Sequence, residues 1–208
     1  MPFNFLRRRR RDAAADAADA AAGGYSFEGL TEEWRLAGYL VIESPVREAL
    51  NKREALKLRG MLWGAIDGTD PLGPASGLKA VDPYDLIVIA AGAGAADILD
   101  TSQMQALRVH RVPYQVRLDC NAFQIVGTVH LPPGSPPESL LDRHSELFLA
   151  VTDAGAYLND HLLLGPDVLL VNRSYLRGVK QIESAGDEVL EAEAQGEQRP
   201  EAASPPSG

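Results

Sequence analysis

The stretch AFQIVGTVHLPPGSPPESLLDRHSELFLAVTDAGAY, residues 122–157, decides the fold, because EWRLAGYLVIESPVREALNKREALKLRGMLWGAI, residues 33–66, has the same pattern. Three positions match at one constant offset: Trp34 with Phe123, Leu36 with Ile125, and Gly38 with Gly127. Two residues are inserted around PPGSPP, and the match then resumes: Leu50 with Leu141, Leu56 with Leu147, Leu58 with Leu149, and Gly64 with Gly155. A shared register of this length indicates an internal repeat.

Each copy has the pattern of short β-strands. Apolar and polar residues alternate around Gly38 and Gly127, which predicts a half-buried strand with a bend or bulge at the glycine. The apolar runs YDLIVI (84–89) and PDVLLV (166–171) align as equivalent central strands that are buried on both faces. Residues 46–56 predict a single helical turn, because their counterpart begins with prolines.

These patterns predict a mainly β fold of two tandem small β-barrel or rolled-sheet modules, with a short helix or two in the connections. The expected parts are a basic, Ala-rich tether, disordered or helical, at 1–24, a first β module at 25–92, a part-helical connection at 93–112, a second β module at 113–182, and an acidic disordered tail at 183–208.

Charge and cysteine content limit the class of protein. The net charge is −9, with +2 in residues 1–24 and −6 in residues 183–208, so the remaining chain carries about −5 and is a poor general binder of nucleic acid. The single cysteine, Cys120, has no partner for an internal disulfide, which favours the cytoplasm. No apolar run reaches the roughly 20 residues that span a bilayer.

The N-terminal segment MPFNFLRRRRRD combines apolar side chains with five arginines. We expect it to contact an anionic membrane surface or nucleic acid, or else to form a solvated basic tail. The residues that would make the contact are Phe3, Phe5, Leu6, Arg7, Arg8, Arg9, Arg10 and Arg11. Membrane contact would place the protein peripherally at the inner membrane face.

The stretch LIVIAAGAGAADILD, residues 86–100, has part of a dinucleotide-binding fingerprint. Gly92 and Gly94 follow an apolar strand, but Asp97 occupies the position of the third glycine and no further βαβ units follow. We therefore expect a connection with a helix over about 95–107. A nucleotide-dependent enzyme that uses Gly92 and Gly94 is the alternative.

Other candidate sites have weak signals. The four histidines, His110, His130, His144 and His161, do not have metal-ligand spacing, so neither a metal nor a cofactor is expected. A catalytic set of nucleophile, base and orienting carboxylate can be composed from Cys120, His130 and either Asp119 or Asp142. A part-buried thiol and surface imidazoles are the favoured interpretation of these residues. A polar pocket can be drawn from Asp153, Asn172 and Arg173, although turn formation is the commoner use of Asp and Asn. Trp34 and Trp63 are expected in the core.

Residues 116–182 resemble a group of small, uncharacterised bacterial β domains. The resemblance rests on the strand with a central glycine, the Leu-Leu-Asp step at 140–142, FLAVTDA at 148–154 and the closing strand VLLVN at 168–172. Residues 30–91 share it only through the internal repeat. The strand-bend-strand pattern is also faintly similar to Sm-like barrels. The first resemblance implies a fold type without catalytic residues, and the second implies RNA binding by a ring.

The sequence therefore predicts a non-enzymatic binding or scaffold protein in the cytoplasm. The expected partners are an unidentified protein, an anionic membrane surface or a second copy of the chain, with nucleic acid less favoured. An RNA-binding Sm-like protein is the second alternative, beside the nucleotide-dependent enzyme.

Overall fold

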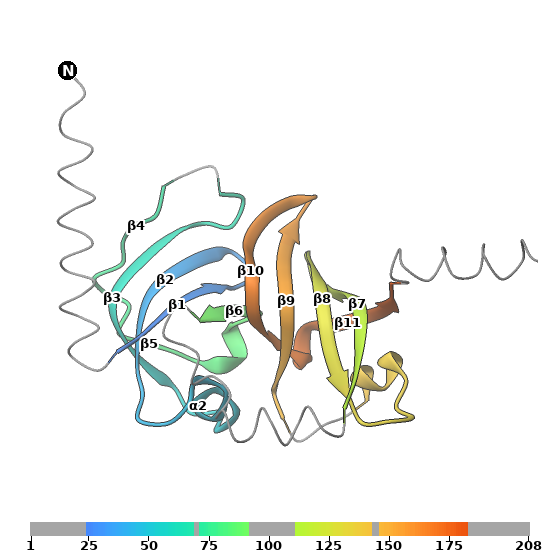
Figure 1. Ribbon diagram of the computed structural model, residues 1–208. Coiled ribbons are helices and arrows are strands. Elements are labelled where there is room, and N and C mark those ends of the chain that lie inside the picture. Colours follow the sequence, from blue (N-terminus) through green and yellow to red (C-terminus); the bar gives the residue numbers. More distant parts are fainter. Residues whose placement is uncertain (1–23, 69–70, 92–110, 143–145, 183–208) are drawn as a thin grey trace, which may run out of the picture.

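The computed structural model describes residues 24–68, 71–91, 111–142 and 146–182, and the strands in these ranges form one antiparallel sheet (Figure 1). The first half contains β1 (Tyr25–Leu30), β2 (Trp34–Val41), α2 (Val46–Asn51), β3 (Leu56–Ala65), β4 (Gly73–Pro74), β5 (Ala80–Val81), the 3-10 turn η1 (Pro83–Asp85) and β6 (Val88–Ala91). The second contains β7 (Val112–Cys120), β8 (Phe123–Leu131), the 3-10 turn η3 (Pro137–Leu141), β9 (Phe148–Leu158), β10 (His161–Asn172), the 3-10 turn η4 (Arg173–Tyr175) and β11 (Leu176–Gln181).

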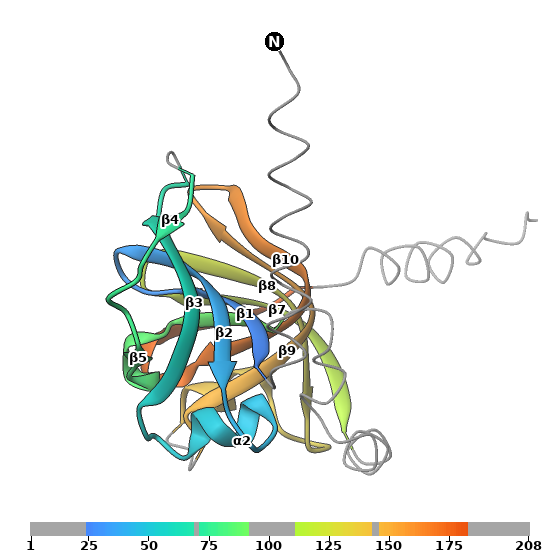
Figure 2. The same ribbon diagram turned by 90° about the vertical axis from the view of Figure 1, so that its left-hand side faces the viewer.

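The strand order is β11-β7-β8-β9-β10-β6-β1-β2-β3-β4, with β5 also paired to β3. The mainly β prediction is confirmed. The finer prediction of two tandem small β-barrel or rolled-sheet modules is not confirmed, because β6 and β10 join the two halves into one 11-stranded sheet that does not close within the described residues. Figures 1 and 2 show strands that curve strongly within this single sheet.

The central junction corrects one predicted equivalence. We expected residues 84–89 and 166–171 to occupy matching places in two modules, but they are neighbours. The pairs are Leu169 with Ala90, Leu170 with Ile89, and Val171 with Val88. Both runs are apolar because both lie at the centre of one sheet, where each face is covered. The apolar pattern of the two runs therefore predicted their burial correctly, but it placed them wrongly at equivalent positions in two modules.

The pairings also correct the alignment of β3 with β9. Ala37 of β2 faces Leu62, whereas the matching Val126 of β8 faces Gly155, so Leu62 rather than Gly64 corresponds to Gly155. A bulge follows at the same place in each pair. Its left-handed residue is Gly60 (φ 59°) in β3 and Asp153 (φ 49°) in β9. The sequence register was therefore wrong by two residues over this strand.

The predicted bends at Gly38 and Gly127 are confirmed by register shifts between Ala37 and Tyr39 and between Val126 and Thr128. A Cβ on Gly127 would lie 2.7 Å from the Ala154 Cβ and 2.9 Å from its Cα. Glycine is required there because the two strands approach too closely for any side chain.

The helical turn predicted within 46–56 is confirmed by α2, which has six residues and whose counterpart η3 is a five-residue 3-10 turn. The tether, the helix predicted over 95–107 and the acidic tail lie outside the described residues.

Two buried clusters form the core, and the halves exchange side chains between them. The cluster of the first half includes three residues of the second half: Leu147, which precedes β9, Phe148 from β9 and Leu170 from β10. The cluster of the second half contains Leu30 and Val88 from β1 and β6. Each core is therefore completed by the other half.

Two asparagine side chains tie buried backbone groups across this core. The Asn51 Oδ1 atom accepts hydrogen bonds from the backbone N–H groups of Leu147 (2.7 Å) and Phe148 (2.9 Å). The fully buried Asn172 donates from Nδ2 to the carbonyl of Leu86 (2.8 Å). Buried polar groups need such partners, so both amides have structural roles.

Candidate functional site

The best candidate site is a groove of about 860 Å³ at the β3 edge of the sheet. In Figure 2, β3 faces the viewer, with β2 on one side and with β4 and β5 along its other edge. The groove, which we call the β3 groove, is lined by Val41, Lys57, Leu58, Arg59, Gly60, Met61, Leu62, Pro74, Ala75, Ser76, Leu78 and Lys79. Its volume lies in the range of roughly 300–1,000 Å³ that is typical of ligand sites.

Short strands at both ends of β3 produce this groove. β4 pairs with β3 at Leu62 and Trp63, and β5 pairs with it at Leu56 and Lys57, so the connecting residues 75–79 arch across the strand between them. Two backbone hydrogen bonds of 2.8 Å fix the ends of the arch: Ala75 N–H to Met61 C=O, and Leu58 N–H to Lys79 C=O. The groove is thus held open by backbone pairing.

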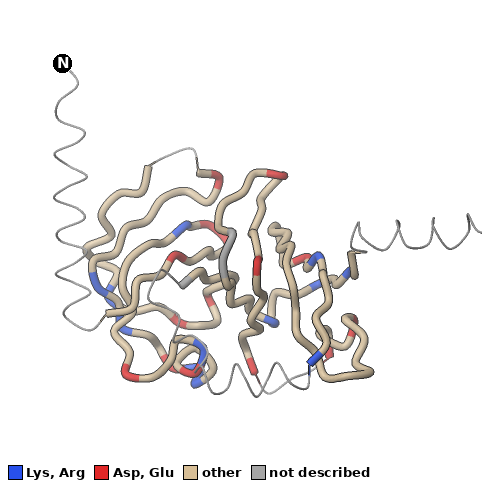
Figure 3. The backbone as a smooth tube through the Cα atoms, viewed as in Figure 1, with Lys and Arg blue, Asp and Glu red and all other residues tan. Residues whose placement is uncertain are grey.

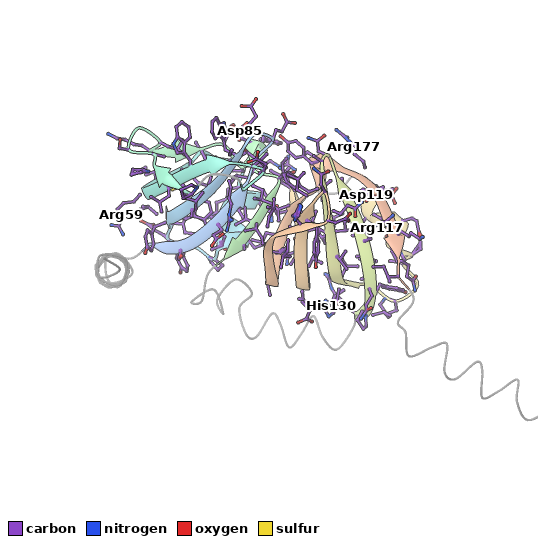
Figure 4. All side chains as sticks on the ribbon, turned by 90° about the horizontal axis from the view of Figure 1, so that it is seen from above. Arg59, Asp85, Arg117, Asp119, His130 and Arg177 are labelled. Carbon is purple, nitrogen blue, oxygen red and sulfur yellow. The ribbon has the colours of Figure 1, made fainter. Side chains whose placement is uncertain are left out.

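The lining is apolar with a cationic border. Buried Leu58 and Met61 lie at its base, while Val41 and Leu62 expose 45% and 38% of their surface beside them. Lys57, Arg59 and Lys79 supply the charge, and none of the described lining residues is acidic. Figure 3 shows basic residues along this side of the sheet, and Figure 4 shows Arg59 at its end.

Our sequence reasoning missed this groove. The signal that was present is the alternation of leucine and cation in LKLRGM, residues 56–61, on an otherwise acidic chain. Alternation places Lys57 and Arg59 on the same side of a strand. What the sequence did not show is that the glycine- and proline-rich segment 71–79 returns to the same strand.

The opposite edge of the sheet also carries basic residues. There Arg117 Nε lies 3.7 Å from the Asp119 carboxylate, and Arg177 is on the outer strand β11. Figure 4 shows Arg117, Asp119 and Arg177 on one half of the molecule and Arg59 at the far end of the other.

The nucleophile, base and orienting set drawn from the sequence is not assembled. His130 pairs with Pro113 on β7, and Cys120 lies seven residues further along that strand, a separation of about 23 Å. Asp119 adjoins Cys120, but its carboxylate contacts Arg117. Figure 4 shows His130 far from Asp119, at the opposite end of this strand pair.

Cys120 itself is fully buried at the end of β7. Burial raises the pKa of its thiol from 9.0 to about 12, with a smaller contribution from Asp119, while Arg177 acts in the opposite direction. We expect Ellman's reagent to leave this thiol unmodified at pH 8 in the folded protein and to react with it in urea, because only an exposed thiolate attacks. Rapid reaction of the folded protein would contradict the burial.

The same shift predicts a pH dependence of stability. The folded thiol keeps its proton above pH 9.0, whereas the unfolded thiol ionises, so its contribution to stability is complete below pH 9 and is lost between pH 9 and about 12. Urea unfolding at pH 8 and pH 10.5 should therefore show a larger loss for the wild type than for Cys120→Ala. Equal losses would contradict this prediction.

The polar pocket drawn from Asp153, Asn172 and Arg173 is not formed either. Asn172 pairs with Phe148, five residues from Asp153 along β9, or about 17 Å. The guanidinium Nη1 of Arg173 donates to the Leu140 carbonyl (3.1 Å), and burial lowers the Arg173 pKa while Glu146 opposes that shift.

Trp34 and Trp63 were expected in the core, and this is wrong. They expose 40% and 43% of their surface and stack on each other with ring centroids 4.8 Å apart. β2 and β3 place them as diagonal neighbours on one face, where each ring covers part of the other. Mutual stacking thus replaces the burial that their size suggested.

The remaining sequence candidates are outside the described residues. These are Phe3, Phe5, Leu6, Arg7, Arg8, Arg9, Arg10 and Arg11, as well as Gly92 and Gly94. Membrane attachment, nucleotide binding and cytoplasmic location stay predictions. The described residues contain no helix long and apolar enough to cross a membrane and no cluster of three or more His, Cys, Asp or Glu side chains suited to a metal ion.

No protein-family model, no curated protein and no solved structure matches this chain. The resemblances to small bacterial β domains and to Sm-like barrels therefore stay predictions.

Proposed function

We propose that this is a non-enzymatic binding protein that holds an acidic, partly apolar segment of a partner protein in the β3 groove. The observation that carries the proposal is an apolar groove bordered by Lys57, Arg59 and Lys79, without an acid among its lining residues, on a chain with a net charge of −9. A cationic site on an acidic protein attracts acidic ligands while the rest of the surface repels them.

Apolar contacts supply the second part of recognition. Val41 and Leu62 are exposed beside the buried Leu58 and Met61, so an apolar side chain that enters the groove removes both surfaces from water. Each side chain of this size that is buried contributes about 1.5–3 kcal/mol. In a segment with carboxylates on either side of one apolar residue, the carboxylates contact the cationic border of the groove while the apolar side chain packs on its base.

A binding role also agrees with the side chains that the groove offers. Its lining contains aliphatic, cationic and hydroxyl groups, and it contains no carboxylate, imidazole or thiol that would take up or release protons near neutral pH. A polypeptide is favoured over a small molecule because the groove is open to solvent along the strand.

Fluorescence anisotropy with a labelled peptide of alternating glutamate and valine tests the proposal. We expect the full-length protein to bind it, with affinity that falls as salt is added, and not to bind the lysine and valine peptide. The double variant K57E/S76E changes the charge at the groove by −3 and should weaken binding by about tenfold or more, the effect of roughly 1.4 kcal/mol.

The matched control is K52E/S174E, which makes the same change in charge at exposed positions outside the groove. It should bind the acidic peptide like the wild type. Equal binding by wild type and K57E/S76E would contradict the proposal, and stabilisation by laurate without any peptide binding would assign the groove to a fatty acid instead.

We further propose that the two halves are diverged copies of one rolled-sheet module. Their common strand order supports this proposal. So do matching details: the bulges opposite Gly38 and Gly127, which place Gly60 and Asp153 in the left-handed region, and the side-chain caps of η1 and η4 by Asp82 and Asn172.

A further inference from the structure

In the part of the chain that the structure describes, the two outermost edges of the sheet correspond to strands that meet at its centre. The second half has the order β11-β7-β8-β9-β10, and the first half has β6-β1-β2-β3 followed by β5. β11 therefore occupies the place of β6. β5 corresponds to the C-terminal end of β10, because Val81 of β5 pairs with Leu56 of β3 in the same way that Val171 of β10 pairs with Leu149 of β9. The outer edges are the same two kinds of strand that join the halves.

The central junction shows what such a pairing requires. Its paired residues are all apolar: Leu169, Leu170 and Val171 on β10, and Val88, Ile89 and Ala90 on β6. Asn172 extends the pairing, because its backbone N–H donates to the Ile87 carbonyl (2.9 Å) and its side-chain amide to the Leu86 carbonyl (2.8 Å).

The outer edges differ from this junction at three positions that matter for pairing. Lys79 replaces Leu169, Asp82 replaces Asn172, and Lys180 replaces Ala90. β11 also has Arg177 and Gly178 at the places of Ile87 and Val88. If β11 of one copy paired with β5 of another in the register of the junction, Lys79 would lie opposite Lys180. Like charges directly opposite each other destabilise a strand pair.

Asp82 adds a second obstacle. At the junction, the side-chain amide of Asn172 donates to the carbonyl of Leu86, which precedes β6. The corresponding carbonyl in β11 is that of Leu176. The Asp82 carboxylate already accepts from the Tyr84 N–H and has no hydrogen to donate to that carbonyl. Two acceptors would therefore face each other at the edge of the contact.

We propose that a second copy of this chain fits these edges head to tail, and that Lys79, Asp82 and Lys180 keep the wild type monomeric by opposing that contact. Charged residues, lysine above all, are a known means of protecting sheet edges. The same Lys79 that repels β11 borders the β3 groove, so the edge rejects a basic strand and admits an acidic one. The inference does not depend on which ligand the groove holds.

Sedimentation velocity of the full-length triple variant K79L/D82N/K180A tests the proposal, because these substitutions copy Leu169, Asn172 and Ala90. We expect the wild type to sediment as a monomer of 22.4 kDa. The triple variant should form species larger than a dimer that grow with concentration, since a head-to-tail contact leaves one active edge at each end.

Splitting the substitutions makes the test more specific. K79L/D82N removes both the lysine pair and the Asp82 carboxylate, so it should self-associate, although more weakly than the triple variant, whereas K180A alone keeps Asp82 and should stay monomeric. An oligomeric wild type, a triple variant that is folded but monomeric, or self-association of K180A as strong as that of the triple variant would overturn the proposal.

Discussion

Truncation of Phe148 to alanine is expected to destabilise the protein by about 3–5 kcal/mol, a large part of the roughly 5–15 kcal/mol that folded domains possess. Phe148 is fully buried at the start of β9 but belongs to the core of the first half. Its removal leaves a cavity where the two halves meet. Urea unfolding followed by far-ultraviolet circular dichroism measures the loss.

Leu162→Ala is the control for this prediction. Leu162 exposes 51% of its surface near the turn between β9 and β10, so its truncation should change stability by less than about 1 kcal/mol. Both tryptophans lie in the first half, and their fluorescence should follow the same transition as circular dichroism in every variant. Separate transitions would show that the halves unfold independently, contrary to their shared cores.

Asn172→Asp is expected to destabilise the protein by at least about 3 kcal/mol at neutral pH, because it removes a buried donor and adds a buried charge. The Asn172 amide donates to the Leu86 and Pro83 carbonyls, and its oxygen accepts from the Ser174 N–H. A carboxylate of the same shape keeps only the last of these bonds. Thermal unfolding of both proteins at pH 7 gives the difference.

The pH dependence of this variant separates the charge from the lost donor. Burial raises the pKa of a new carboxyl, so the folded variant holds its proton to higher pH than the unfolded chain does. The deficit relative to the wild type should shrink as the pH falls below the unfolded pKa and grow as it rises. Asp82→Asn, the reverse exchange at the exposed counterpart, should have little effect, and a deficit independent of pH would exclude a buried charge.

Local patterns predicted the strands well and their arrangement poorly. The bends at Gly38 and Gly127 could be predicted because close strand approach demands glycine, a requirement that one residue carries. The shift of two residues in β3 could not, since alternating leucines match equally well when displaced by two residues: Leu56 and Leu58 fit Leu147 and Leu149 by type, whereas the strand pairings align Leu56 with Leu149.

Joining of the two halves was missed for a different reason. The apolar run around Ile89 and Leu170 indicates a strand covered on both faces, but the same pattern fits any central strand. Which strand lies beside it depends on the edges of both halves. Lys79 and Lys180 mark the outer edges in the sequence, although their meaning is apparent only once β5 and β11 are known to be terminal.

The candidate site was the least predictable part. Functional motifs in a sequence predict sites whose residues are close together in the chain. The β3 groove is instead formed by β3 together with residues 74–79, which return to that strand after an intervening connection. Trp34 and Trp63 drew attention as large apolar side chains, yet their size was accommodated by stacking at the surface.

The exchange of side chains between the two cores sets the order in which the protein can fold during translation. When the ribosome has released only the first 146 residues, Leu147, Phe148 and Leu170 are absent from the cluster that includes Leu40 and Leu50. The emerging chain therefore presents apolar surface that chaperones bind, and its N-terminal half reaches a finished interior only after β10 has left the exit tunnel.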